Sequence, residues 1–155
     1  MYFKDPHKLS ALFSKTSLTI TQKIQTEPPP MYHPDLSFYW ATPDQKEIKV
    51  GYGTCLQLIS EDLNAPLKHI QTLIHLIKKH TKDLPLLFFG GTAFHAAECL
   101  KKTPWAPFYQ ASMILPEYLY ELKDGQWLVT HYQRSDQQPS ATPQPSKKTF
   151  QAVTP

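Results

Sequence analysis

The stretch Phe88-Phe89-Gly90-Gly91-Thr92-Ala93-Phe94 decides the fold, because an apolar run stops there at two adjacent glycines. This pattern is typical of a buried strand whose backbone turns sharply or lies against another backbone, since only glycine lacks the Cβ atom that would clash. Asp83-Leu84-Pro85 interrupts the segment before it, so the sequence predicts a strand from Pro85 to Phe89 that ends at the double glycine. Residues 93–102 are expected to form a short helix or an irregular loop.

An amphipathic helix is predicted upstream of this strand. Its apolar residues recur at spacings of three and four, which places them on one helical face. Pro66 is tolerated in the first turn, and Lys78-Lys79-His80 suit the negative end of the helix dipole. We expect the apolar face to cover a sheet. Its residues are Leu67, Ile70, Leu73, Ile74 and Ile77.

The other segments have the patterns of antiparallel strands. Residues 17–25 alternate apolar and polar side chains, which is the period of a half-buried strand. Residues 36–41 form an aromatic strand, and a turn at residues 42–44 leads into a second strand from Ile48 through Leu58, relieved by Gly51 and Gly53. Further strands are expected over residues 108–113, 117–123 and 126–133, the last two joined by a tight hairpin at Asp124-Gly125. The predicted fold class is therefore α+β, an antiparallel β-sheet with packed helices.

Composition narrows the functional classes. The formal charge of +3 comes from 16 Lys+Arg against 13 Asp+Glu, and Arg134 is the single arginine. Proteins that bind nucleic acid favour arginine forks on a clustered basic face, so we expect no nucleic-acid partner. Cys55 and Cys99 form no paired motif, and charged residues interrupt the first segment. We therefore expect reduced core thiols in a cytoplasmic protein with no membrane partner.

The chain divides into two parts by composition. Residues 1–134 have the apolar content of one folded domain, whereas residues 135–155 are rich in Ser, Gln, Pro, Thr and Lys. Such a segment buries too little apolar surface to form a core. We expect residues 1–134 to be a scaffold domain and residues 135–155 to be a flexible linker or tail.

A series of short motifs resembles the amino-terminal part of isochorismate synthases, within the chorismate-utilising enzymes related to anthranilate synthase component I. The resemblance extends from about Leu18 to Tyr132 and depends on the order and spacing of its motifs. They are Phe38-Tyr39-Trp40 with Pro43, Gly51-Tyr52-Gly53, the Phe-Gly-Gly-x-x-Phe segment at residues 89–94, Trp105-x-x-Phe108 and Leu115-Pro116.

The resemblance implies the fold of the amino-terminal half of these enzymes, but not their chemistry. In that family a lysine in a Lys-Val-Val-Leu-Ala-Arg-like motif activates water, a glutamate acts as acid, and later glutamate and histidine motifs hold magnesium and chorismate. The reaction moves the chorismate hydroxyl from C4 to C2 and feeds menaquinone or siderophore synthesis. None of these motifs occurs in this sequence.

Two interpretations therefore remain open. The chain is either an amino-terminal fragment of an isochorismate synthase that is inactive alone, or a freestanding non-catalytic interaction or binding module derived from that fold. In the first case the chain comes from a truncated or interrupted gene, or from a split gene whose other chain supplies the catalytic half as a partner. Magnesium then belongs to the complete enzyme. An independent small enzyme is the weakest possibility, because no set of residues has the pattern of a catalytic site.

The individual candidates favour structural roles. His69, His75 and His80 are six and five residues apart, so no two share a helical face as a metal pair would. His33, His95 and His131 lack an acid or cysteine partner at a suggestive spacing. Histidines at such positions more often lie on surfaces or at helix ends.

The glycine, acidic and cysteine candidates are equally weak. Gly51-x-Gly53 precedes a predicted strand rather than a helix, and Leu56 takes the place of the third glycine of a dinucleotide fingerprint. Gly90-Gly91 could expose amides to an anion such as a carboxylate, but close packing is favoured. Nothing indicates that Glu117 and Glu121 converge, or that Cys55 or Cys99 is activated. The sequence thus assigns no catalytic, cofactor-binding or metal-binding residue.

Overall fold

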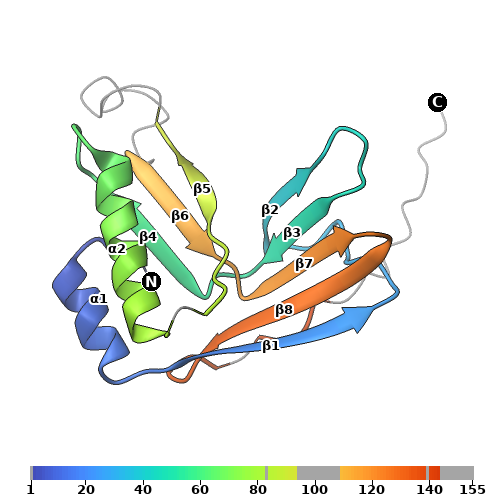
Figure 1. Cartoon of the computed structure of the whole chain (residues 1–155), viewed down its shortest axis with the longest axis horizontal. Coiled ribbons are helices and arrows are strands. Elements are labelled where there is room, and N and C mark those ends of the chain that lie inside the picture. Colours follow the sequence, from blue (N-terminus) through green and yellow to red (C-terminus); the bar gives the residue numbers. More distant parts are fainter. Residues whose placement is uncertain (1, 83, 94–108, 139, 144–155) are drawn as a thin grey trace.

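A computed structural model describes residues 2–82, 84–93, 109–138 and 140–143. Within these ranges the chain forms two helices and eight strands (Figure 1), and the α+β class predicted from the sequence is confirmed. In chain order the elements are α1 (Pro6–Phe13), β1 (Leu18–Gln25), β2 (Leu36–Ala41), β3 (Ile48–Tyr52), β4 (Leu56–Ser60), α2 (Pro66–His80), β5 (Phe89–Thr92), β6 (Ala111–Leu115), β7 (Tyr118–Lys123) and β8 (Gln126–Arg134).

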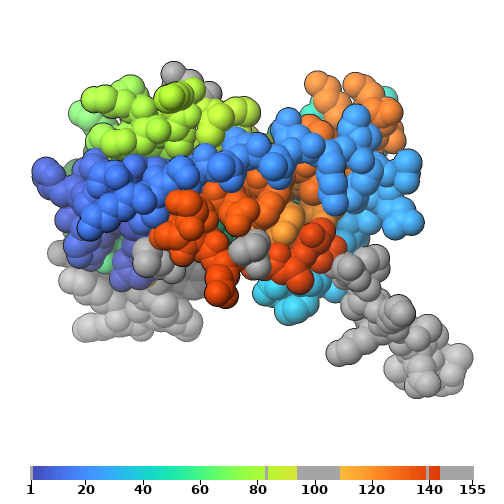
Figure 2. Space-filling model, turned by 90° about the horizontal axis from the view of Figure 1, so that it is seen from below, coloured from blue at the N-terminus to red at the C-terminus, as the bar shows by residue number. Residues whose placement is uncertain are grey.

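The strands form two antiparallel sheets. The larger sheet has the order β1-β8-β7-β3-β2 and the smaller one the order β4-β6-β5. α2 lies against the smaller sheet, α1 lies beside α2, and the larger sheet extends away from the smaller one at an angle (Figure 1). β1 and β8 run side by side across the larger sheet (Figure 2), in register from the Leu18–Arg134 pair to the Gln25–Trp127 pair.

The two sheets meet where the chain passes directly from one to the other, twice. β3 continues into β4 through residues 53–55, and β6 continues into β7 through residues 116–117, and we call these two crossings the corner. The amide of Cys55 donates to the carbonyl of Leu115 (2.9 Å), and the amide of Glu117 donates to the carbonyl of Tyr52 (3.0 Å). Strand pairing therefore continues through the bend on both sides.

The corner corrects the prediction of one strand from Ile48 through Leu58. The chain forms two strands there, in different sheets. Gly53 breaks the run because its φ of +63° lies in the left-handed region, which costs glycine little and other residues more. The glycine that was expected only to relieve a strand in fact ends it.

The core lies between the helices, the smaller sheet and one face of the larger sheet. Ile70, Leu73 and Ile77 of α2 are fully buried there, as the helical periodicity predicts, whereas Leu67 is 46% exposed. α1 contributes Leu9 and was not predicted. Its signal was present in the sequence, because Asp5 caps the amide of His7 (2.8 Å) and Pro6 occupies the first turn.

A second apolar cluster lies on the other face of the larger sheet. Tyr118 and Tyr120 of β7 belong to this cluster and Leu119 to the main core, as strand alternation requires. The triple-proline loop packs against it, since Pro29 and Pro30 are buried and the hydroxyl of Tyr52 donates to the carbonyl of Pro30. The larger sheet is thus covered on both faces near the corner.

Two further boundaries differ from the predictions. β5 spans Phe89–Thr92 rather than residues 85–89, so the strand runs through the double glycine instead of ending there. β6 spans Ala111–Leu115 rather than residues 108–113. The hairpin at Asp124-Gly125 is confirmed, with φ of 51° and 76°. The helix or loop expected over residues 93–102 lies, beyond Ala93, outside the described residues.

We predict that Gly90→Ala destabilises the protein by about 3 kcal/mol, because a Cβ atom on Gly90 would lie 1.8 Å from the carbonyl oxygen of Ser112 on the paired strand. Gly91→Ala is the matched control. A Cβ atom there meets nothing within 4 Å among the described residues, so its effect should stay within about 1 kcal/mol. Urea unfolding of both variants measures the difference, and equal midpoints would contradict the close-packing role of Gly90.

Candidate functional site

The corner buries a carboxylate. Glu117 lies between β6 and β7 and is only 3% exposed. Both of its carboxylate oxygens accept hydrogen bonds from Ser140, one from the backbone N–H and one from the hydroxyl, each 2.7 Å long. These bonds supply part of the stabilisation that water would give to the charge.

An imidazole lies beside this carboxylate. His131 of β8 is the cross-strand partner of Tyr118, and its ring stacks on the tyrosine ring with centroids 4.3 Å apart. Its Nε2 atom lies 3.8 Å from Oε1 of Glu117, which is too far for a hydrogen bond. Among the described residues this buried nitrogen has no hydrogen-bond partner. The corner thus holds a buried carboxylate and an imidazole that lie close together but form no hydrogen bond with each other.

Sequence spacing could not bring these two residues together. Glu117 and His131 are 14 residues apart and meet only because β7 and β8 pair. The hairpin turn at Asp124-Gly125 held the necessary signal, since counting outward equally from it pairs Tyr118 with His131. Glu117 and Glu121 do not act together, because Glu121 pairs instead with Lys49 of β3 (3.5 Å).

A small cavity of about 170 Å³ opens beside Glu117. Its lining includes Asp35, Tyr52, Gly53 and Tyr118. Gly53 shapes the wall, since a Cβ atom there would lie 3.1 Å from Oε2 of Glu117. Ligand pockets usually have at least about 300 Å³, whereas a cavity of about 150 Å³ can hold a molecule the size of benzene, so this cavity suits a small group or one part of a larger ligand.

The corner also holds the single arginine of the chain. Arg134 is 7% exposed and donates from Nη1 to the carbonyl of Cys55 (3.1 Å) and from Nε to Asp136 (2.9 Å). Its guanidinium is therefore engaged by the protein. Burial raises the pKa of the Cys55 thiol to about 12, in agreement with the interpretation of this cysteine as an unreactive core residue.

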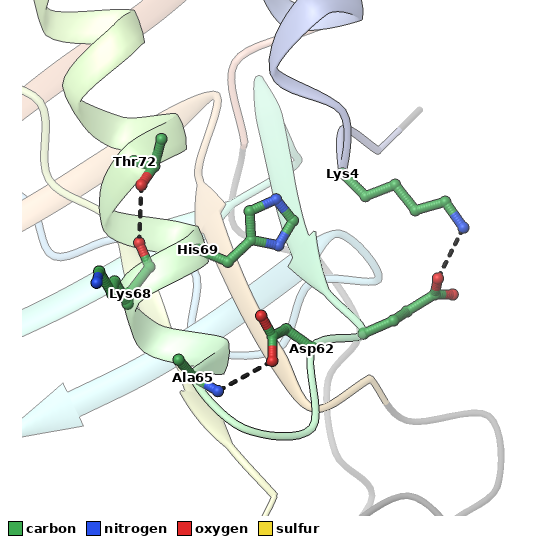
Figure 3. A pocket seen from close by; sticks show the side chains of 7 residues that line it. Lys4, Asp62, Ala65, Lys68, His69 and Thr72 are labelled. Atoms are coloured by element: carbon green, nitrogen blue, oxygen red, sulfur yellow. Dashed lines mark hydrogen bonds and ion pairs between the residues drawn. The ribbon is translucent and has the colours of Figure 1, made fainter.

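A second pocket, of about 400 Å³, lies at the start of α2. His69 projects from the helix into the space bordered by Lys4 and Asp62 (Figure 3). Its Nδ1 atom lies 3.0 Å from the hydroxyl of buried Ser60. Lys4 pairs with Glu61 (2.8 Å), and the amides of Ala65 and Asn64 lower the pKa of Asp62 by hydrogen bonding. Of these side chains, Asp62 contacts the backbone that leads into α2, by accepting from the amides of Asn64 and Ala65.

The other histidines have local structural contacts. The ring of His80 stacks on Phe13 of α1 with centroids 5.9 Å apart. His33 accepts a hydrogen bond from the amide of Asp35 (3.2 Å) and packs edge-on against Tyr52. His75 is exposed on α2. His95 and Cys99 lie outside the described residues.

The two glycine motifs are packing sites in the described residues. A Cβ atom on Gly51 would lie 2.0 Å from the ring of Phe38, and that ring stacks on Phe89 with centroids 3.5 Å apart. This contact joins β2 of the larger sheet to β5 of the smaller one. Gly51 and Gly90 therefore allow close approach within and between the sheets, as the sequence analysis favoured.

Metal-ligating side chains do not cluster in the described ranges of the chain. In the part of the chain that the structure describes, no three His, Cys, Asp or Glu side chains gather where they could hold a metal ion.

Within the same residues, no helix combines the length and the apolar character that crossing a membrane requires.

The comparison with known proteins identifies the family. Residues 13–152 match the protein family described as chorismate binding enzyme. No curated protein and no solved structure matches the chain. The family match covers most of the sequence, including both sheets and both crossings of the corner. The chain belongs to the chorismate-binding enzyme family, as its motifs suggested.

We predict that the Cys55 thiol of the native protein reacts with iodoacetamide only very slowly between pH 7 and pH 9, because its pKa is raised to about 12. A Cys99→Ser background leaves Cys55 as the only thiol. Mass spectrometry of labelled protein gives the rate, and the same protein in urea is the control. Equal labelling rates in native and unfolded protein would contradict the burial of Cys55.

Proposed function

We propose that this chain is the amino-terminal scaffold part of an isochorismate synthase and is inactive alone. Two observations support the proposal: the chorismate-binding family match over residues 13–152, and the ordered motifs from Phe38-Tyr39-Trp40 to Leu115-Pro116. The motifs that carry the family's water-activating lysine, acid and metal ligands are absent from the sequence. The family match is the single observation that carries the proposal most strongly.

The described cavities support an inactive scaffold. Chorismate is a dicarboxylate, and the cavity at the corner is lined by the carboxylates of Glu117 and Asp35, which would repel it. That cavity is also small, at about 170 Å³. In the pocket at α2, Lys4 is paired with Glu61. Among the described residues, Lys68 is the one lysine lining that pocket without an ion pair, and the carboxylates of Glu61 and Asp62 border the same space.

In this proposal a separate chain supplies the catalytic half, and that half holds magnesium. The edge strand β2 supports a missing partner. It carries no charged residue, and Tyr39 and Trp40 are each 46% exposed, whereas isolated edge strands are usually protected by charge or proline. Phe88 and Phe89 pack against the core instead, and Trp105 lies outside the described residues.

The alternative function is a freestanding interaction or binding module that kept the fold without the chemistry. The exposed edge of β2 could equally bind the partner of such an interaction module, so this edge supports both proposals. The two proposals differ in whether the chain needs a partner to be stable. Both place the protein in the cytoplasm, and neither distinguishes menaquinone from siderophore synthesis.

We predict that the purified chain does not convert chorismate to isochorismate in the presence of magnesium. The reason is that the sequence lacks the family's base, acid and metal motifs. Product formation is measured by chromatography against a control without protein. Turnover that follows the protein through repeated purification would contradict the proposal.

We also predict that the isolated chain self-associates, because the uncharged edge of β2 exposes Tyr39 and Trp40. Trp40→Lys should reduce the association by placing a charge on this edge. Thr21→Lys, on exposed β1, adds the same charge elsewhere and should not. Dynamic light scattering and thermal unfolding provide the measurement. A strictly monomeric wild-type chain with a high unfolding midpoint would favour the freestanding module instead.

A further inference from the structure

The chain does not leave the domain after β8. Residues 135–143, Pro139 aside, return along the corner, and we call this segment the strap. Its first residue extends the β1–β8 pairing, since the amide of Ser135 donates to the carbonyl of Ser17 (2.9 Å) and the amide of Ser17 donates to the hydroxyl of Ser135 (3.0 Å). The strap therefore begins in a fixed position beside the larger sheet.

The strap contacts both crossings of the corner. At the first crossing, the side-chain amide of Gln137 donates to the carbonyl of Thr54 (3.4 Å), next to the bond from Arg134 to the carbonyl of Cys55. At the second, Ser140 donates twice to Glu117, and the hydroxyl of Tyr118 donates back to the carbonyl of Ser140 (3.0 Å). One short segment thus ties together two places that are more than 60 residues apart in the chain.

The contact between the strap and the second crossing involves a buried charged group, because Ser140 donates to the carboxylate of Glu117. Among the described residues, this carboxylate accepts hydrogen bonds only from Ser140. A buried charge that loses its hydrogen bonds costs much more than the same loss at the surface. The corner must therefore admit water to Glu117 whenever the strap leaves.

The strap is nevertheless attached mainly by hydrogen bonds, and Pro143 is its one buried residue among those described. Ser135, Gln138 and Ser140 are exposed, and no strand or helix forms after Arg134 within the described residues. Segments with few buried contacts open at a lower free energy than the core. The strap can therefore open without unfolding the sheets that it ties together.

We propose that residues 135–143 are a detachable strap that controls solvent access to the corner through the Ser140–Glu117 contact. The docked strap forms one wall of the cavity beside Glu117 and protects both crossings. Release exposes Glu117 and the unpartnered Nε2 atom of His131. The inference goes beyond the proposed function, because it holds whether or not the chain belongs to an isochorismate synthase.

Hydrogen–deuterium exchange of two truncations tests the inference. A chain that ends at Pro143 keeps the strap, and one that ends at Arg134 loses it. In the strapless chain we expect the amides of Cys55 and Glu117 to exchange at least tenfold faster, with α2 unchanged. In the chain that ends at Pro143 they should exchange as in the full chain. Unchanged corner amides in the strapless chain would overturn the inference, and so would fast exchange throughout α2, which would make the strap part of the core.

A pair of substitutions gives a second test within the full chain. Ser140→Ala removes the hydroxyl bond to Glu117 but keeps the backbone bond, so exchange at Glu117 should rise about tenfold. Gln138→Ala changes an exposed residue of the same strap and should have no effect. Equal exchange at Glu117 in the two variants would also overturn the inference.

Discussion

Everything in this fold depends on the continuation of strand pairing through the corner. The bonds from Cys55 to Leu115 and from Glu117 to Tyr52 carry the ladder from one sheet to the other, so neither sheet ends in unpaired backbone there. Gly53 makes the bend possible because its φ is positive. The consequence is that two small sheets and two helices share one core instead of forming separate units.

Membership of the chorismate-binding family and the chemistry of the corner lead to different expectations. The family implies a site for a dicarboxylate, whereas the corner concentrates the carboxylates of Glu117 and Asp35 around a small cavity. This contrast is understandable if the described residues are mainly scaffold. A scaffold has to hold angles and edges accurately, and a buried, hydrogen-bonded acid at a bend serves that purpose without touching a substrate.

Local pattern made part of this fold predictable. The buried face of α2 and the hairpin at Asp124-Gly125 follow from periodicity and turn chemistry, which operate over a few residues. The break at Gly53 was missed because a glycine inside an apolar run is compatible with a continuous strand as well as with a bend. The proximity of Glu117 and His131 was missed because it depends on the register between β7 and β8. The contact of Glu117 with Ser140 was missed because the polar composition of residues 135–155 does not indicate that the chain returns to the corner.

The burial of Arg134 has a consequence for the chemistry of the whole surface. Arg134 is the only arginine, so every other strongly basic side chain in the sequence is a lysine. Its guanidinium is bound to the carbonyl of Cys55 and to Asp136 inside the protein. Ammonium groups lose their charge near pH 10 and can be acylated, whereas a guanidinium keeps its charge. Amine chemistry could therefore invert the net charge of this protein while leaving its internal cation in place.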